Sequence, residues 1–219
     1  MLSSLGIYVR NELTPAETAL DDENWAKLQS HNTFLAGRME SISQMAYQQN
    51  RNLMQEYGIP NWSQEEWVEM KKDDGIEYNF ASNVSVTYNG FHNKSHEDKK
   101  DINGWTYGIF SYINKKTGEP IPPPSSDLGN GFLFPRHAYL IDFSKSNGII
   151  ELLWKTTKFE HQTTKAPPSL QHKDENTWTH FGCSFQINKN LANISRKLKE
   201  ANRAVIAEAT FCKQQRYGS

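Results

Sequence analysis

Two kinds of hydrophobic spacing divide the chain, and the first lies between residues 14 and 60. Apolar residues recur there three or four positions apart, which is the spacing of a helical face. The run begins with "TPAE", which offers Thr14 as N-cap, Pro15 at the first helical position and Glu17 for a capping box. It ends at "GIP", residues 58–60, so we expect one or two helices between these signals. Their predicted buried face consists of Trp25, Leu28, Leu35, Met39, Ile42, Ala46, Leu53 and Tyr57.

The second kind of spacing, alternation of apolar and polar residues, begins near Phe80 and is typical of strands. Before it, Ser63 and Glu66 form a second capping box and predict a short helix. The runs "WTYGIFSYI", "FLFPRHAYLIDF", "IIELLWKTT" and "WTHFGCSFQI" are strand-like. The second and third are joined by "SKSNG", a tight-turn signal, so we expect them to form a hairpin. A closing helix should follow, with Leu191, Ile194, Leu198, Val205 and Ala209 on one face.

Helices at both ends of a block of short strands predict an α+β fold, with the strands in a sandwich or an open barrel. We expect a single domain over residues 1–219. Its parts would be a helical region at 1–75, a strand core at 76–190 and a helical segment at 191–219.

Composition narrows the class of protein. A hydrophobic fraction of 37% and a charged fraction of 22% are those of a globular chain and exclude a disordered one. The formal charge is -1, so any basic surface must be local. Cys183 and Cys212 are too few for a disulfide framework, the first residues lack the apolar core of a signal peptide, and no apolar run reaches the roughly 20 residues of a membrane helix. We therefore expect a soluble protein of a reducing, intracellular compartment.

The candidate chemistry lies in "FHNKSHEDKK", where two histidines and an aspartate, His92, His96 and Asp98, lie within seven residues. His96 and Asp98 would point to the same face of an extended segment. Two histidines and one carboxylate make the facial triad of non-haem Fe(II) oxygenases, and His161 is the candidate for the third ligand. A solvated loop is the alternative reading of this charged run. His92 is expected to be a supporting or surface residue.

A second His-x-Asp pair, His172 and Asp174, competes with the first. It lies in the polar loop "PSLQHKDENT", has no strand pattern beside it and leaves little chain for a distal partner. We interpret it as a chance match.

Four segments carry a family resemblance: "VSVTYNGFHNKSHEDKKDINGWT", "GFLFPRHAYLIDF", "GIIELLWKTTKFEHQTT" and "TWTHFGCSFQINKNL". In this order they resemble the TET/JBP-type dioxygenases that depend on 2-oxoglutarate and Fe(II), especially the short fungal TET-like members. The resemblance covers about Val84 to Leu191 and leaves out the helical N-terminus. It implies a double-stranded β-helix with helices packed outside, and Fe(II), 2-oxoglutarate and molecular oxygen as cofactor and cosubstrates.

Carried over residue by residue, the resemblance implies His96, Asp98 and His161 as catalytic iron ligands. It implies Asn93, Asp101 and Asn103 as substrate-binding residues. The predicted cosubstrate-binding residues are His180, Arg136 and Ser184.

One of these positions departs from the family. The closing strand commonly carries an arginine that binds the distal carboxylate of 2-oxoglutarate, and "TWTHFGCS" has His180 there. A histidine cannot make the two-pronged contact of a guanidinium. Either His180 takes the role in its charged form, or Arg136 or another cation does, or cosubstrate binding is impaired. A purely structural histidine is the further alternative.

The expected substrate is methylated double-stranded DNA in the nucleus, with 5-methylcytosine as first choice and 6-methyladenine as second. The base would be flipped into the pocket. The rival readings are an oxygenase for a protein side chain or a small molecule, and an inactive nucleic-acid-binding module. Phosphate contacts would come from a segment in which cations outnumber carboxylates, namely Lys189, Arg196, Lys197, Lys199, Arg203, Lys213 and Arg216 against Glu200 and Glu208. A solvated outer helix face explains this segment equally well.

Overall fold

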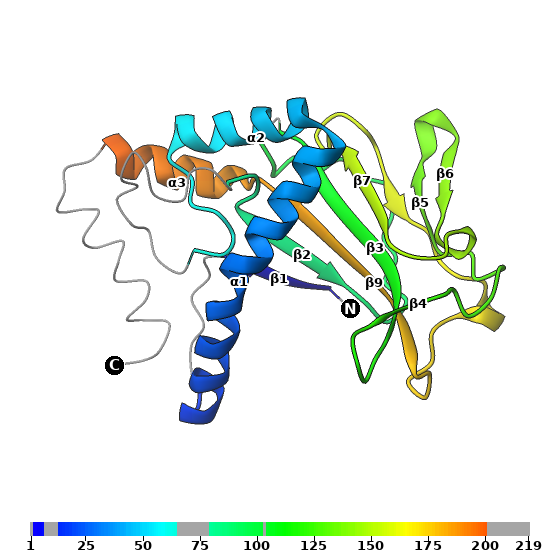
Figure 1. Ribbon diagram of the computed structural model, residues 1–219. Coiled ribbons are helices and arrows are strands. Elements are labelled where there is room, and N and C mark those ends of the chain that lie inside the picture. The colour runs from blue at the N-terminus through cyan, green and yellow to red at the C-terminus, as the bar shows by residue number, and fades with distance from the viewer. Residues whose placement is uncertain (1, 7–12, 65–78, 103, 201–219) are drawn as a thin grey trace. The chain divides into compact units, whose positions relative to one another are not determined.

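The computed structural model describes residues 2–6, 13–64, 79–102 and 104–200 (Figure 1). These residues form three helices and two antiparallel sheets, which is an α+β architecture, as predicted. The chain divides into two compact units, one of residues 1–4 and 85–185 and the other of residues 5–84 and 186–219. None of the described helices is long and apolar enough to cross a membrane.

The N-terminal helices begin and end where the sequence signals lie. Helix α1 spans Pro15–Ile42, and Thr14 caps it through the predicted capping box with Glu17. Helix α2 spans Gln44–Tyr57 and ends at Gly58, whose φ of 65° is left-handed and therefore suits glycine. Between them Ser43 is extended, with φ -157°, and its side chain accepts a hydrogen bond from the backbone N–H of Ala46. The predicted helical region therefore consists of two helices.

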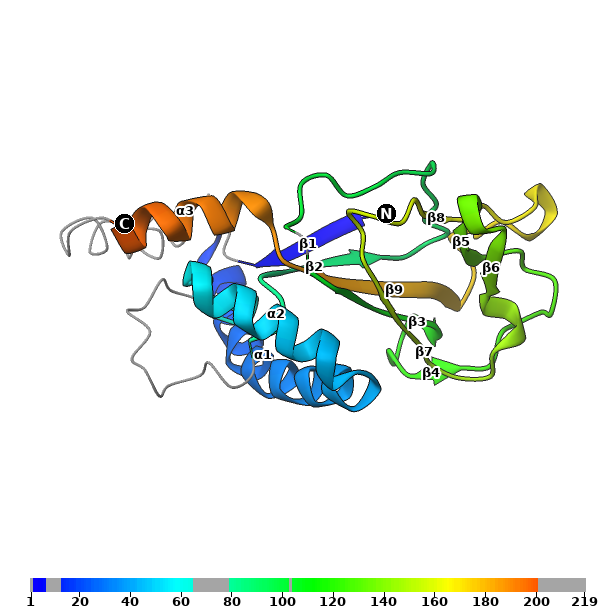
Figure 2. The ribbon, with the colours of Figure 1, turned by 90° about the horizontal axis from the view of Figure 1, so that it is seen from above.

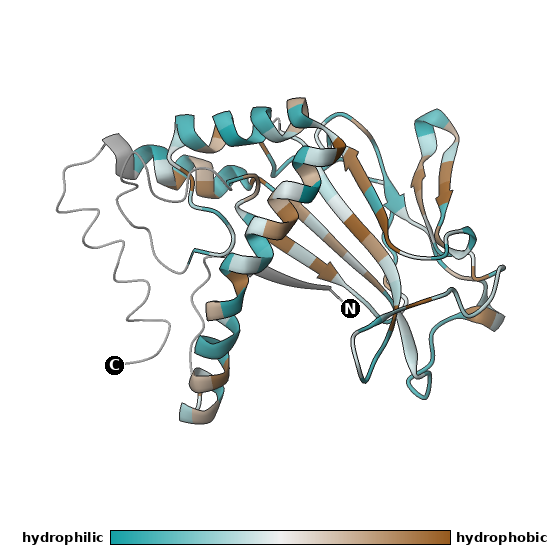
Figure 3. Cartoon of the chain, viewed as in Figure 1, coloured by the Kyte–Doolittle hydropathy of each residue, from teal (hydrophilic) through white to brown (hydrophobic). Residues whose placement is uncertain are grey.

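Packing of the helical unit confirms the predicted buried face only in part. Met39 and Ala46 are buried, whereas Ile42 is 43% exposed. Polar residues that a hydrophobic pattern cannot detect occupy part of this interior, since Asn32 and Asn50 are fully buried and Asn50 donates to the carbonyl of Phe80 at 2.8 Å. Helix α2 is largely polar along its length (Figure 3). Helix α3 spans Lys189–Glu200 and packs against α2 within the same unit.

The larger sheet is built around β3, Thr106–Asn114. Its order is β1 (Leu2–Gly6), β2 (Asn83–Thr87), β9 (Trp178–Gln186), β3 and β4 (Pro120–Ile121). Strand β7, Ile150–Trp154, pairs with the first half of β3 on the side that β4 occupies farther along. The smaller sheet has the order β6 (Tyr139–Asp142), β5 (Gly131–Phe134) and β8 (Gln162–Thr163) (Figure 2).

The predicted hairpin between "FLFPRHAYLIDF" and "IIELLWKTT" is wrong. Pro135 and the left-handed Ala138, with φ 49°, divide the first run into β5 and β6, which pair with each other. Proline cannot donate to a ladder, so a strand interior cannot continue through it. Strand β7 then crosses to the other sheet and pairs with β3. The second predicted capping box ends at Glu66, which lies outside the described residues.

Aromatic side chains fill the interior of the strand unit. The buried cluster contains Phe110, Tyr112, Leu128, Phe132, Phe143 and Trp154. Gly108 makes room for it, because a Cβ at that position would lie 2.6 Å from Cζ3 of Trp154. The metal-binding candidates lie at one border of this aromatic interior.

Candidate metal centre

A two-residue ladder brings the predicted ligands together across a large stretch of sequence. The N–H of His96 donates to the carbonyl of His161 at 3.0 Å, and the N–H of His161 donates to the carbonyl of His96 at 2.9 Å. Because residues directly opposite in an antiparallel pair project to the same face, both imidazoles lie on one side of this bridge. Their ring centroids are 4.6 Å apart.

The carboxylate of Asp98 completes the group. Its Oδ1 lies 3.4 Å from Nε2 of His96, and its Oδ2 lies 3.6 Å from Nε2 of His161. All three donor atoms lie within 4.8 Å of one another. Cis ligands of an octahedral ion at about 2.1 Å are roughly 3 Å apart, so a small contraction would seat a metal. Two nitrogens and one oxygen on one side of an ion leave the opposite positions open.

Hydrogen bonds fix both imidazoles in the form that binds a metal. Nδ1 of His96 lies 2.8 Å from the carbonyl oxygen of Lys94, and Nδ1 of His161 lies 2.8 Å from that of Phe159. A carbonyl only accepts, so each Nδ1 carries the proton and each Nε2 presents its lone pair to the centre. The donor set therefore fits Fe(II).

The two histidines differ in their surroundings. His161 is 4% exposed, with the ring of Phe132 stacked at 5.4 Å and the ring of Trp154 at 5.7 Å on edge. The side chain of His96 is 37% exposed. The centre is thus closed on the side of the aromatic interior and open on the side of His96.

Asp98 and Asp101 are both tied to Thr156, which follows β7. The backbone N–H of Asp98 donates to the carbonyl of Thr156 at 3.0 Å, and the Thr156 hydroxyl donates to Oδ2 of Asp101 at 3.1 Å. Burial and then the nearby charge of Asp98 raise the pKa of Asp101 to about 7. The predicted substrate-binding residue Asp101 therefore lies beside the metal ligands.

The other predicted substrate-binding residues have different positions. Asn93 accepts the N–H of Thr163 through its Oδ1 at 2.7 Å, so it fastens the ligand-bearing segment to β8. Asn103 lies outside the described residues. His92 is exposed, and its Nδ1 lies 3.2 Å from the carbonyl of Gly90.

His180 lies deep in the aromatic interior and not on a charged surface. It is 3% exposed, and the rings of Phe143 and Phe110 stack on it at 4.6 and 6.2 Å. Burial lowers the pKa of His180 to about 4, which disfavours the charged form near neutral pH. Its Nε2 is buried and has no hydrogen-bond partner in the described part of the chain.

Tyr112 also has a buried polar group without a partner among the described residues, and no pattern in the sequence marked it as a candidate. It is the register partner of His180 on β3, and its hydroxyl is also buried without a partner. Two buried polar groups without partners are costly, and a carboxylate would satisfy both. These neutral donors match a carboxylate of 2-oxoglutarate, and the predicted role of His180 in binding the cosubstrate stays a prediction. Ser184 lies on the same face of β9 as His180, opposite Gly108.

Arg136 contacts carboxylates next to the metal ligands. Its Nε donates to Glu160 at 2.7 Å, and its Nη1 lies 3.7 Å from Glu97. Ser95 donates to the other oxygen of Glu160 at 2.7 Å. The side chain of Arg136 is 68% exposed, so this network braces the outer surface of the centre, and a role in holding 2-oxoglutarate stays a prediction.

The competing His-x-Asp pair forms no such group. His172 stands with its ring edge toward Trp178 at 6.1 Å, and Asp174 is exposed. Over the described ranges, His96, Asp98 and His161 form the one cluster of three metal-binding side chains.

The basic C-terminal segment is described only in part. Lys189, Arg196 and Lys197 are exposed on α3. Arg203, Glu208, Lys213 and Arg216 lie outside the described residues, so the predicted phosphate-binding surface stays a prediction.

Comparison with known proteins agrees with this geometry. The family model of the Tet-like 2OG-Fe(II) oxygenase superfamily matches residues 1–166, a range that contains all three ligands. No curated protein matches the chain. The chain is a 2-oxoglutarate- and Fe(II)-dependent oxygenase, and it belongs to the Tet-like 2OG-Fe(II) oxygenase superfamily.

Proposed function

We propose that this oxygenase oxidises the methyl group of a methylated DNA base, with 5-methylcytosine as first choice and 6-methyladenine as second. The observation that carries the proposal is the convergence of His96, Asp98 and His161 in a chain of the Tet-like family. A DNA substrate would also place the protein in the nucleus.

We further propose that the strand unit is a double-stranded β-helix. Successive strands alternate between the sheets, with β3 in the larger, β5 and β6 in the smaller, β7 in the larger, β8 in the smaller and β9 in the larger. The bridge between His96 and His161 adds the ligand-bearing segment beside β8. Winding of this kind would put the metal between the two sheets.

Different residues have different roles in the proposed reaction. When bound, Fe(II) with 2-oxoglutarate and oxygen supplies the oxidising power, and the protein supplies the positions. His96, Asp98 and His161 would hold the iron and leave open sites. Tyr112 and His180 would receive a carboxylate through uncharged donors. Phe132 and Trp154 exclude water from the buried side of His161.

Asp101 is the candidate for contact with the target base. Its carboxylate accepts a hydrogen bond from the hydroxyl of Thr156, whose carbonyl accepts the N–H of the ligand Asp98, and a carboxyl group can bind the amino edge of cytosine or adenine. A methyl group inside a duplex cannot reach a recessed metal, so the nucleotide would be flipped out.

Succinate release after loading with Fe(II) and 2-oxoglutarate tests the proposal. Duplexes that carry 5-methylcytosine, 6-methyladenine or no methyl group are compared, and the oxidised base is identified by mass spectrometry. Release that depends on the methylated base supports the proposal. Turnover with a peptide or a small molecule, and with none of the duplexes, would show that the substrate is not DNA. DNA binding without any turnover would show that the protein is an inactive nucleic-acid-binding module.

A further inference from the structure

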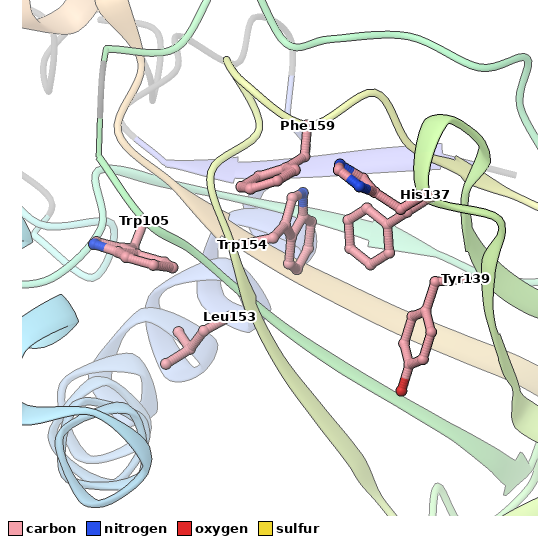
Figure 4. Close-up of a pocket in the computed structure, with 7 residues that line it drawn as sticks. Trp105, His137, Tyr139, Leu153, Trp154 and Phe159 are labelled. Carbon is pink, nitrogen blue, oxygen red and sulfur yellow. The ribbon is translucent and has the colours of Figure 1, made fainter.

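An aromatic pocket lies beside the metal centre but contains none of its ligands (Figure 4). Its volume is about 340 Å³, at the lower end of the range for small-molecule sites. The walls come from Trp105, Leu153 and Trp154 on one side and from the β5–β6 hairpin and the segment before His161 on the other. The hairpin and this segment contribute Phe134, His137, Tyr139 and Phe159.

One side chain of the pocket, Trp154, carries a buried donor. Trp154 is 3% exposed, and its Nε1 has no hydrogen-bond partner among the residues that the structure describes. Figure 4 shows this nitrogen at the end of the indole nearest Phe159 and His137, both of which line the pocket. An indole N–H only donates, so a ligand that satisfies it must bring an acceptor at its edge. A purely apolar ligand would leave the donor unsatisfied.

Charge excludes a cationic ligand. Among the described residues no carboxylate lines the pocket, and the ammonium group of Lys155 already lies 5.0 Å from the centre of the Trp105 ring. A second cation on these rings would meet a like charge. Lys155 and the exposed Lys158 instead favour a ligand whose outer part is anionic.

We propose that this pocket binds an unpaired nucleobase of the strand that carries the target base, next to the base that reaches the metal. A base offers a flat face to stack on Trp105 and Tyr139 and a carbonyl or ring nitrogen for Trp154, and its phosphates would lie toward Lys155 and Lys158. The choice of a strand over a free nucleotide rests on the proposed function. The ring of Trp154 is 5.7 Å from that of His161, so the two sites are neighbours.

Metal-free protein tests the pocket without any turnover. Anisotropy of a short fluorescein-labelled oligodeoxythymidylate gives the affinity for wild type, Trp105→Ala and Tyr139→Ala. Tyr139 is 61% exposed, so its truncation should not disturb folding. We expect each variant to bind roughly five- to hundredfold more weakly, the range for loss of one stacking ring. Trp154→Phe, which keeps a ring and loses the donor, should bind more weakly than wild type.

Leu140→Ala is the matched control, because Leu140 is 51% exposed on the same hairpin and does not line the pocket. Its affinity should equal that of wild type. Equal binding by wild type and both ring variants would overturn the proposal, as would the absence of binding. A nucleoside monophosphate bound as tightly as the oligonucleotide would overturn the choice of a strand. Ring-dependent binding without oxidation of any methylated base would retain the pocket and refute the proposed function.

Discussion

Tyr112 and His180 face each other across β3 and β9, with ring centroids 5.4 Å apart, and neither the Tyr112 hydroxyl nor His180 Nε2 has a hydrogen-bond partner. Both groups are buried in an interior that consists largely of aromatic and aliphatic side chains. Burial raises the pKa of the Tyr112 hydroxyl and lowers the pKa of His180 to about 4, so both are neutral over the physiological range. An anion that enters here would meet hydrogen-bond donors and no formal charge.

Tyr112→Phe should therefore weaken 2-oxoglutarate binding by roughly tenfold or more, since it removes a hydrogen bond to a charged group and little volume. Affinity in the iron-loaded protein should stay level between about pH 6 and 8, because neither donor titrates there. Calorimetry at several pH values measures both effects. Tyr139→Phe, which removes an exposed hydroxyl, is the control. A large loss in Arg136→Ala with none in Tyr112→Phe would assign the carboxylate to Arg136.

His180 should make the stability of the protein depend on pH below neutrality. Its folded-state pKa of about 4 lies below the unfolded value of about 6.5, so the unfolded chain binds a proton that the folded chain resists. Stability should fall as pH decreases from about 6.5 to 4, by an amount on the order of 3 kcal/mol. Urea unfolding of wild type and His180→Phe over this range measures it.

His180→Phe should lose the part of the pH dependence of stability that comes from His180. Asp101, whose pKa is raised, contributes with the opposite sign in both proteins and cancels in the comparison. His31→Phe changes an exposed histidine of α1 and should keep the wild-type slope. Identical slopes in wild type and His180→Phe would show that His180 charges freely in the folded state.

The local signals of this sequence predicted local structure well. The capping box of Thr14 and Glu17 and the left-handed Gly58 depend on neighbouring residues only, and both lie where predicted. The pairing of β7 with β3 depends on residues far apart, so a turn signal at Asn147 and Gly148 could not reveal it. Buried Asn50 is satisfied by the carbonyl of Phe80, which no periodicity contains.

In the candidate site, too, the features that depend on neighbouring residues could be predicted, and most of those that depend on distant contacts could not. His96 and Asp98 are recognisable by their spacing. His161 was a candidate from its place after a strand-like run, and the family resemblance implied it as well. Tyr112 remained hidden because a tyrosine inside an apolar strand reads as core, and only the register with His180 reveals its orphan hydroxyl. Trp154 was hidden for the same reason.

Replacement of each ligand should remove the iron and leave the fold intact. His96→Ala, Asp98→Ala and His161→Ala should each lose bound iron and turnover, because three donors are the minimum of a facial triad. Thermal unfolding should still be cooperative, since the strand unit packs around an aromatic core. Metal analysis after gel filtration measures the stoichiometry. His172→Ala and Asp174→Ala should keep full iron, and iron loss in these two alone would transfer the centre to the second pair.

Gly108→Ala should destabilise the protein by about 1–3 kcal/mol. A Cβ there would lie 2.6 Å from the Trp154 ring and 2.9 Å from Phe110, and neither ring has room to withdraw in a packed interior. Displaced Trp154 should also loosen His161 and lower the affinity for iron. Chemical denaturation compares it with Gly37→Ala, an exposed helical site with no atom within 4 Å, which should gain about 1 kcal/mol. Equal stability of the two variants would show that Trp154 moves at no cost.

The backbone bridge between His96 and His161 also sets an order of events during synthesis. A growing chain that has passed Asp98 carries two ligands, yet the third arrives only after β3, β5, β6 and β7 have been made. Until the strands between them have folded, no more than a weak two-ligand site exists for any metal. Iron loading should therefore be a late step, and a chain that stalls before residue 161 would leave the ribosome without a reactive metal.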